Sequence, residues 1–261
     1  SLTRKEQNMK KRLCVVVFLS VFLIVGLGTQ VLADSPAYET VKGAFDYARG
    51  KTSISKVKMV IHRPDWTRTM VLKCQTKGQH DSLFYITEPK ENFGSGTLKN
   101  EHGMWSFDPK INRTVRIPPS MMSQDWNGSD FSNNDLSKNE DELKLYTHKV
   151  IGSETNDGKK VDVIESIPKK GAPVTWGMIK FYIREDKIIV KSEFFDEDFK
   201  LVKKMTASQI QMMGGKLFAK FGKMEEASMS SKYTTIEYEN ITFDKEISDR
   251  VFTIFSLQNP R

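Results

Sequence analysis

Residues 57–75 read VKMVIHRPDWTRTMVLKCQ, and apolar residues alternate with polar ones through most of this stretch. The apolar positions are Val57, Met59, Ile61, Trp66, Met70, Leu72 and Cys74. Successive side chains of a β-strand point to opposite faces of the sheet, so a period of two predicts strands with one buried face. This stretch is therefore expected to be β-structure whose apolar positions share a face.

The same alternation recurs along the rest of the chain. Phe84 and Ile86, then Val115 and Ile117, repeat it over shorter runs. The sequence Asn-Asp-Gly at 156–158 predicts a hairpin turn, because these residue types tolerate a positive φ. Longer runs lie at 161–163, 176–184, 187–195, 201–212, 216–226 and 232–243. The chain is predicted to be mainly antiparallel β, of the α+β class, with about ten to twelve strands.

Two stretches break the strand pattern. Residues 36–50 place apolar side chains at helical spacing, and Gly50 can end that helix. Residues 118–136 are rich in Pro, Ser, Asn and Asp but keep Met121, Met122, Trp126 and Phe131. A twisted sheet of about eleven strands curls or closes. The helix and the insert are therefore expected to cover the mouth of an incomplete, strongly curved β-barrel.

The N-terminal segment has the three parts of a secretory signal peptide. Lys10, Lys11 and Arg12 precede an uncharged apolar run at 13–28, and Val31 and Ala33 give a small-x-small cleavage site. We interpret Met9 as the start, residues 1–33 as upstream residues plus a cleaved signal, and residues 34–261 as a single domain. An uncleaved anchor helix is the alternative, although the apolar run is short for the ~20 residues that span a bilayer.

Charge and cysteine content narrow the class of protein. Residues 1–33 hold five of the 40 basic and one of the 33 acidic side chains, so the net charge of +7 falls to +3 for residues 34–261. A nearly balanced chain without a basic, aromatic-rich stripe is not expected to bind nucleic acid. Cys74 is the only cysteine after the signal, which excludes an internal disulfide and predicts a buried, small apolar side chain.

Motifs of catalysis and metal binding are missing from the sequence. The four histidines, His62, His80, His102 and His148, are far apart and do not have metal-ligand spacing. Ser95 lacks the flanking glycines of a nucleophile elbow, and no phosphate-binding glycine loop is present. Asp125, Asp130 and Asp135 fit turn-capping roles better than a calcium loop. The sequence therefore predicts no enzyme, no cofactor, no catalytic residue and no metal site.

Methionine is unusually frequent, with 11 of the 12 methionines lying after residue 33. Methionine is unbranched and adaptable, and it suits surfaces that must accept acyl chains of varied shape. The alternative is a Met-rich packed core. Alternation alone does not separate a filled barrel from a hollow one, so both interpretations stay open on the residues.

Several segments resemble the bacterial outer-membrane lipoprotein-sorting protein family, across residues 35–257. They are 61–68 (IHRPDWTR), 94–99 (GSGTLK), 104–113 (MWSFDPKINR), 126–131 (WNGSDF), 146–149 (YTHK) and 249–253 (DRVFT). The resemblance implies the LolA/LolB-like fold, an incomplete antiparallel barrel with helices closing its mouth. It also implies a periplasmic protein that carries lipoproteins or other acyl-chain lipids between the inner and outer membranes. Membrane contact would then be transient.

A second function stays open beside the carrier. In this alternative the protein is a non-carrying periplasmic accessory subunit that docks on an inner-membrane lipid transporter or an envelope assembly. A carrier would draw on a large driving force, because each buried CH₂ is worth about 0.8 kcal/mol and one ~16-carbon chain releases roughly 10 kcal/mol gross. Such a protein needs a soft, partly open cavity with a movable cap.

The carrier hypothesis assigns residues to a cavity and a cap. The expected cavity lining is Val57, Met59, Ile61, Trp66, Met70, Leu72, Phe84, Ile86, Trp105, Phe107, Val115 and Ile117. The expected cap is Met121, Met122 and Trp126, with Gly128 as its hinge. A register error of one residue would reverse any face assignment among these positions.

Overall fold

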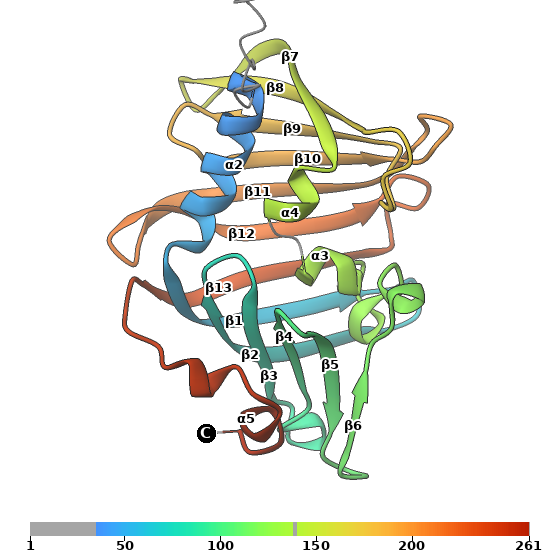
Figure 1. Cartoon of the computed structure of the whole chain (residues 1–261), viewed down its shortest axis with the longest axis vertical. Coiled ribbons are helices and arrows are strands. Elements are labelled where there is room, and N and C mark those ends of the chain that lie inside the picture. The colour runs from blue at the N-terminus through green and yellow to red at the C-terminus, as the bar shows by residue number, and fades with distance from the viewer. Residues whose placement is uncertain (1–34, 138–139, 261) are drawn as a thin grey trace, which may run out of the picture. The chain divides into compact units, whose positions relative to one another are not determined.

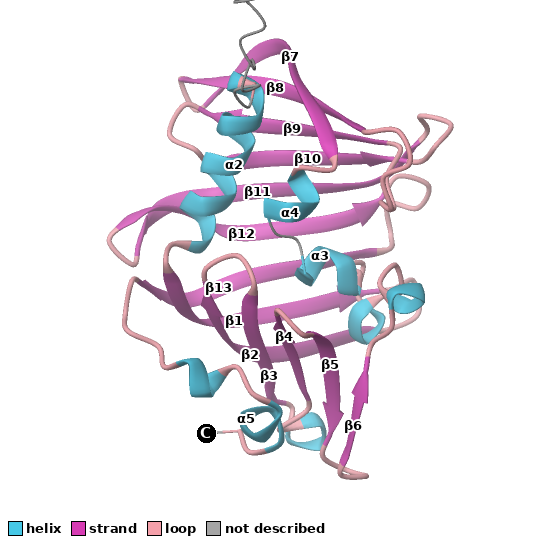
Figure 2. Cartoon of the chain, in the orientation of Figure 1, coloured by secondary structure: helices cyan, strands magenta, loops and turns pink. Residues whose placement is uncertain are grey.

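The computed structural model describes residues 35–137 and 140–260, and within them thirteen strands form one antiparallel sheet (Figures 1 and 2). The sheet order is β6-β5-β4-β3-β2-β1-β13-β12-β11-β10-β9-β8-β7. The strands are β1 (Thr52–His62), β2 (Thr67–Lys77), β3 (Asp81–Glu88), β4 (Gly96–Asn100), β5 (Gly103–Asp108), β6 (Arg113–Arg116), β7 (Tyr146–Asn156), β8 (Lys159–Pro168), β9 (Met178–Arg184), β10 (Ile189–Phe195), β11 (Leu201–Met213), β12 (Lys216–Glu226) and β13 (Tyr233–Phe243). The expected signal peptide at 1–33 lies outside the described residues.

The sheet is a meander that is not closed. Neighbours in the order are consecutive in sequence except β1 and β13, which pair antiparallel from Ser53↔Phe243 to His62↔Tyr233. The strands β6 and β7 stand at the two ends of the order. The predicted mainly antiparallel, incomplete curved barrel is confirmed. Of the helices in the described ranges, none combines the length and apolarity needed to cross a bilayer.

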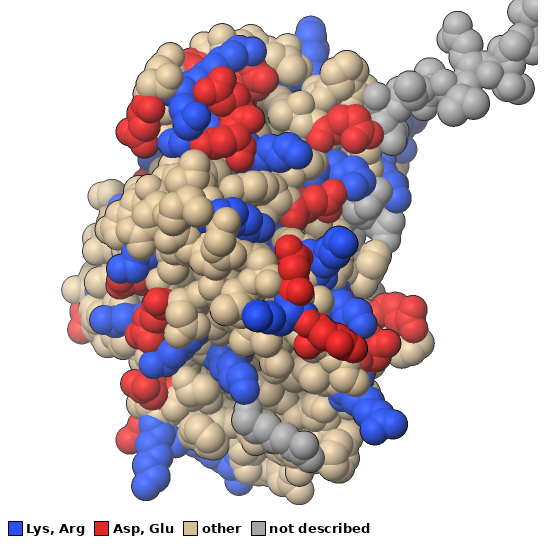
Figure 3. All heavy atoms as spheres, turned by 90° about the vertical axis from the view of Figure 1, so that its left-hand side faces the viewer, with Lys and Arg blue, Asp and Glu red and all other residues tan. Residues whose placement is uncertain are grey.

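One face of the sheet is polar. Ion pairs join neighbouring strands across it, as in Lys56–Glu239, Lys204–Glu225 and Lys220–Glu237, each with a nitrogen–oxygen distance of 2.8 Å. Exposed pairs of this kind contribute about 0–1 kcal/mol each, so they keep the face solvated more than they stabilise it. On the side of the molecule drawn in Figure 3, basic and acidic side chains are interspersed around a broad uncharged area.

Helix α2 (Pro36–Arg49) covers part of the opposite, apolar face (Figure 1). Ser35 caps its N-terminus by accepting a hydrogen bond from the Tyr38 N–H at 3.2 Å, and Gly50 ends it at a φ of +66°. Its buried side chains, Tyr38, Val41 and Ala44 among them, pack on strands β8 to β12. The spacing of these residues predicted this helix to within one residue at its end.

The insert between β6 and β7 covers the rest of the apolar face. It contains η2 (Pro119–Met121), η3 (Trp126–Gly128), α3 (Asn133–Ser137) and α4 (Glu140–Leu143). Trp126, with Phe131 and Leu136, packs on the apolar side chains of β1, β2 and β3. The insert is thus a cover for the curved sheet, as its large apolar residues predicted.

The C-terminal segment packs on the other face of β3, β4 and β5. Ile247, Phe252 and Leu257, the last in α5 (Ile254–Gln258), join Leu83, Tyr85, Leu98 and Phe107 in one buried cluster. The Tyr85 hydroxyl donates a hydrogen bond to the Ser256 carbonyl. Strands β3 and β4 are therefore buried on both faces over most of their length.

Candidate functional site

Eight of the expected cavity and cap residues come together on the concave, apolar face. Seven lie on β1, β2 and β3, and Trp126 of the insert covers them. They are Val57, Met59, Ile61, Met70, Leu72, Phe84, Ile86 and Trp126. The Trp126 indole Nε1–H donates to Thr97 Oγ1 at 2.9 Å and lies edge-on to the Phe84 ring, 6.5 Å between centroids. In this part of the sheet the space above the strands is filled by protein.

Trp105 and Phe107 share a face, as predicted, but it is not the face of Phe84. Trp105 pairs with Leu98 and Ser106 with Thr97, so the two aromatic residues lie on the opposite face from Phe84. Both pack under the C-terminal segment. Because β3 and β4 are buried on both faces over most of their length, alternation in this region marks two apolar faces and does not tell which one points inward.

Trp66 does not share the apolar face either. It lies in the turn before β2 and is 43% exposed. The guanidinium carbons of Arg63 and Arg68 lie 5.7 and 5.6 Å from its ring centroid. The tight turn between β1 and β2, closed by a hydrogen bond from the Arg63 N–H to the Trp66 carbonyl, breaks the period of two at this point.

Val115 and Ile117 border a cleft between β4, β5, β6 and the insert. The cleft has a volume of about 330 Å³, and Met121 and Trp126 border it from the insert side. Phe107, another of the expected lining residues, also borders it, and the rest of the lining is largely polar, with Arg116, Gln124, Asp125, Asn127 and Asn133. A cleft with this mixture of side chains is suited to polar contacts at least as well as to an acyl chain.

The part of the insert that follows Trp126 is anchored by buried polar contacts. The buried carboxylate of Asp130 accepts hydrogen bonds from Arg63 Nη1 at 3.1 Å and from Thr234 Oγ1 at 2.6 Å. Arg63 Nη2 donates to the Gly128 carbonyl at 2.8 Å, and Lys203 Nζ pairs with Asp135 at 2.6 Å. The side chains of Met121, 39% exposed, and of the half-buried Met122 make none of these polar contacts, although their backbone carbonyls accept hydrogen bonds from Asn133 Nδ2 and from the Asn134 N–H. Gly128 has a φ of +71°, a backbone conformation that favours glycine, and its predicted role as a hinge stays a prediction.

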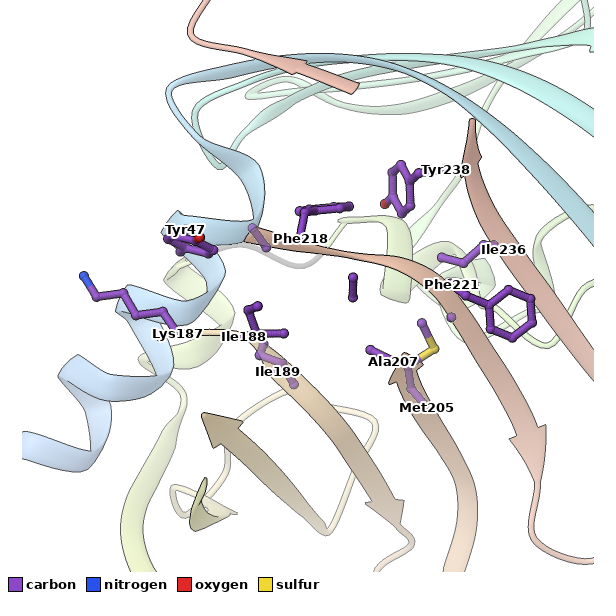
Figure 4. A pocket seen from close by; sticks show the side chains of 13 residues that line it. Tyr47, Lys187, Ile188, Ile189, Met205, Ala207, Phe218, Phe221, Ile236 and Tyr238 are labelled. Carbon is purple, nitrogen blue, oxygen red and sulfur yellow. The ribbon is translucent and has the colours of Figure 1, made fainter. Parts of the chain in front are cut away.

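An apolar cavity lies elsewhere, between the C-terminal end of α2 and strands β10 to β13 (Figure 4). Its volume is about 180 Å³, and it is partly open to solvent. The lining residues are Tyr47, Ala48, Lys187, Ile188, Ile189, Met205, Ala207, Phe218, Ala219, Phe221, Gly222, Ile236 and Tyr238. The cavity shares the concave face with the predicted lining, because Ile236 pairs with Met59 and Tyr238 with Val57.

Small residues create this cavity. Ala207 of β11 pairs with Gly222 of β12. Ala219, three residues before Gly222 on β12, pairs with Ile210 and also lines the cavity. A Cβ built on Gly222 would come within 2.6 Å of Met205 Cε and 3.0 Å of Ile236 Cγ1. These three small residues lie opposite a helix, and the sequence-based prediction of the cavity did not include them. With them, Tyr47, Phe218 and Tyr238 could have been identified as lining residues.

Ring contacts and hydrogen bonds fix the positions of the aromatic residues that line the cavity. The Phe218 ring meets the Tyr238 ring edge to face, 4.9 Å between centroids. Burial raises the pKa of Tyr238 to about 12, so its phenol is neutral at physiological pH. The Tyr47 hydroxyl donates to the Leu217 carbonyl at 2.9 Å, and Lys216 Nζ donates to the Tyr47 carbonyl. These two bonds tie the last turn of α2 to β12.

The described residues include one free cysteine and no cluster of potential metal ligands. Cys74 is buried and free, as predicted, and burial raises the pKa of its thiol to about 12. Over residues 35–137 and 140–260, no group of three or more His, Cys, Asp or Glu side chains is placed to hold a metal ion.

An open, strongly curved antiparallel sheet with a helix and an insert on its concave face defines the LolA-like fold. Residues 78–259 match a family model described as "Uncharacterized protein", and the chain belongs to that family. No curated protein matches the sequence significantly.

Three solved structures share the fold. A DUF1329 family protein from Desulfovibrio piger is 24% identical, with a TM-score of 0.75 over 85% of this chain and 97% of the other. An outer membrane lipoprotein-sorting protein domain from Vibrio parahaemolyticus is 20% identical, with a TM-score of 0.75 over 85% and 98%. A LolA superfamily protein from Nitrosomonas europaea is 20% identical, with a TM-score of 0.69 over 85% and 100%. The predicted relationship to the lipoprotein-sorting fold is confirmed.

Proposed function

We propose that the protein is a periplasmic carrier or binding protein for lipoproteins or other acyl-chain lipids. The observation that carries the proposal is the cavity beneath α2, whose lining is apolar apart from Lys187 and two tyrosine hydroxyls. Concave, mostly apolar sites with few polar groups are typical of ligand binding. The LolA-like fold supports a binding role, since an open sheet with a separate cover leaves room between the two.

The size of the cavity sets how much of a chain it can hold. A cavity of about 150 Å³ takes one benzene molecule, so about 180 Å³ accommodates roughly six carbons. At about 0.8 kcal/mol per CH₂ this gives about 5 kcal/mol gross, whereas association costs about 4–15 kcal/mol. The cavity as it stands would hold a chain end only weakly. A longer chain requires the cavity to widen.

Helix α2 is the element whose displacement would widen it. The helix lies over the cavity at Tyr47 and Ala48, and the bonds of Tyr47 and Lys216 attach this end to β12. The neutral bond of Tyr47 contributes about 1 kcal/mol net and the bond from the Lys216 ammonium about 1.5–3 kcal/mol, so together they are comparable to burying about three to five CH₂ groups. Entry of a chain can therefore offset the loss of these attachments.

Filling the cavity tests the proposal. Ala207→Phe should lower the affinity for a fluorescent fatty-acid analogue at least tenfold, while the melting temperature stays close to that of the wild type. Ala219→Leu is a second filling variant in case the larger ring disturbs the fold. Ala227→Phe, at an exposed position of the β12–β13 turn, is the matched control. Wild-type affinity in both filled variants would refute binding at this cavity.

Localisation in the periplasm rests on residues 1–33, whose basic, apolar and small-residue parts predict export. The mature protein is expected to begin at Asp34 and to fractionate with periplasmic fluid. N-terminal sequencing of the product from cells checks this expectation. A product that starts at Met9 and stays with the membrane would contradict it.

The accessory-subunit alternative has one observation in its favour. The insert fills the space over β1 to β3, as the cluster around Trp126 shows, so much of the concave face offers no room for cargo. Native mass spectrometry of the protein purified from the periplasm separates the two functions. Bound lipid supports the carrier, and a lipid-free protein that co-purifies with an inner-membrane transporter supports the accessory subunit.

A further inference from the structure

Lys187 is the only charged side chain among the thirteen residues that line the cavity. It belongs to the turn between β9 and β10 and is exposed. Figure 4 shows it beside Tyr47 at the edge of the cavity, with its amino group directed away from the apolar interior. The aliphatic stem of a lysine can lie along apolar surface while its charge stays in water. The cavity mouth therefore carries one positive charge.

The backbone of Lys187 is in the left-handed region, with a φ of +68°. Glycine, asparagine or aspartate would adopt this conformation at lower cost. A lysine at this turn position is thus not explained by turn geometry. Its long, charged side chain at the mouth of a cavity supplies another reason for its presence.

Neighbouring carboxylates do not neutralise Lys187. Asp186 is held by Arg184, which donates from Nε at 3.1 Å and from Nη2 at 2.7 Å, and Glu185 lies 3.6 Å from Lys159 Nζ. Within the described ranges no carboxylate oxygen lies within 4.0 Å of the Lys187 amino group. The charge is free to meet a ligand.

Cavity size limits the number of chains. As it stands, about 180 Å³ takes one chain end of roughly six carbons. Displacing α2 far enough to seat the rest of that chain is a smaller change than making room for two or three chains side by side. Resting on the proposed acyl-chain binding, we propose that the ligand is an amphiphile with a single acyl chain and an anionic head group, a carboxylate or a phosphate. Its tail occupies the cavity beneath α2, and its head group lies at the mouth beside Lys187.

The test compares ligands that share a twelve-carbon chain and differ in head group. Dodecanoate and dodecyl phosphate should each bind more tightly than dodecanol. Because the pair is exposed, Lys187 should contribute about two- to fivefold to this preference. In Lys187→Gln the ratio of the dodecanol and dodecanoate dissociation constants should fall by that factor, and in Lys187→Glu it should fall further. Lys170→Gln, an exposed lysine outside the lining, should leave the ratio unchanged.

Each outcome separates this inference from the function on which it rests. If Lys187→Gln leaves the ratio unchanged while Ala207→Phe abolishes binding of all three ligands, the head-group assignment is overturned and acyl-chain binding stands. If no twelve-carbon ligand binds the wild type, both proposals fall. A triacylated lipopeptide that displaces dodecanoate and binds as tightly would overturn the single-chain assignment. If dodecanoate and dodecyl phosphate bind equally tightly, the result confirms the anionic class of head group. If their dissociation constants differ, the tighter ligand identifies the preferred head group.

Discussion

Asp130 shows how a polar insert can hold an apolar cover in place. Its carboxylate side chain is 1% exposed, that of its partner Arg63 is 9% exposed, and Thr234 supplies a further hydrogen bond. A buried ion pair is a poor source of net stability, but removing one partner leaves an uncompensated buried charge. The pair therefore fixes where the insert sits and makes any other position costly.

Arg63→Met should destabilise the protein by about 3–5 kcal/mol, because the Asp130 carboxylate would stay buried without its cation. Urea unfolding followed by circular dichroism measures the change. The control is Lys56→Met, which removes the exposed pair with Glu239 and should leave the free energy of unfolding almost unchanged. Equal losses in the two variants would show that burial does not govern the Arg63 pair.

His148 links strand β7 to the covering elements. Its buried ring contacts Ser166 Oγ through Nδ1 at 2.8 Å and the Leu143 carbonyl through Nε2 at 2.9 Å, and the Ser35 hydroxyl donates to its backbone carbonyl at 3.4 Å. Burial lowers the pKa of His148 below its usual 6.5. The neutral ring satisfies both contacts when Nε2 donates and Nδ1 accepts.

This lowered pKa predicts a pH dependence of stability. The unfolded chain binds more protons than the folded one between the folded pKa and 6.5, so stability is complete above pH 6.5 and is lost as the pH falls toward the folded pKa. Melting temperatures at pH 7.5 and pH 5.0 measure this loss. His148→Gln, which cannot be protonated, should show a smaller difference between the two pH values. An unchanged difference would mean that other groups cause it.

Among the elements, the insert divides into an anchored and an exposed part. Trp126 to Asp135 is held by buried polar contacts, whereas the Met121 side chain borders the cleft near β6 and the Met122 side chain borders a separate surface cleft beside Leu145 and Val174. This division limits which residues can act as a cap. The residues that can act as a movable cap are the two methionines and their immediate neighbours.

Replacing Met121 and Met122 with serine should lower the free energy of unfolding by less than Trp126→Ala does, because Met121 is 39% exposed and Met122 is half-buried, whereas Trp126 is 5% exposed. If the pair caps a bound chain, dissociation of an acyl ligand should become faster in this variant. Trp126→Ala, in the anchored part, should cost about 3–5 kcal/mol. Stopped-flow dissociation and urea unfolding check both points. A loss of several kcal/mol on replacing the methionines would assign them to the core.

The sequence predicted most of the strands and the helix α2. Period-two alternation identified most strands, and helical spacing identified α2. Face assignments succeeded where one face is solvated, as on β1, and failed for Trp105 and Phe107, where the C-terminal segment buries the second face. The cavity was not predicted, because it depends on the small size of a few residues and not on a periodic pattern. Ala207, Ala219 and Gly222 leave space only because α2, far away in sequence, lies opposite them.

At the scale of the whole molecule, the topology has one unusual connection. The hairpins along β1–β6 and β7–β13 join strands that follow one another in the chain, and the insert carries the chain from one end of the sheet to the other. The two series meet at the β1–β13 pair alone among the described strands. The cavity and the cluster around Trp126 lie on either side of this junction, as Ile236 shows by contacting both.

That junction has a consequence for how the protein folds. Paired residues of β1 and β13 are 171 to 190 positions apart in the sequence, whereas the other strand pairs are joined by short turns. Loop-closure entropy delays contacts of high sequence separation, and folding rates fall as the mean separation rises. The two meanders should therefore form first and join last. During synthesis β1 is made well before β13, so the edge of β1 that pairs with β13 stays unpaired until almost the whole sheet has been made, a stage at which a holding chaperone would contribute most.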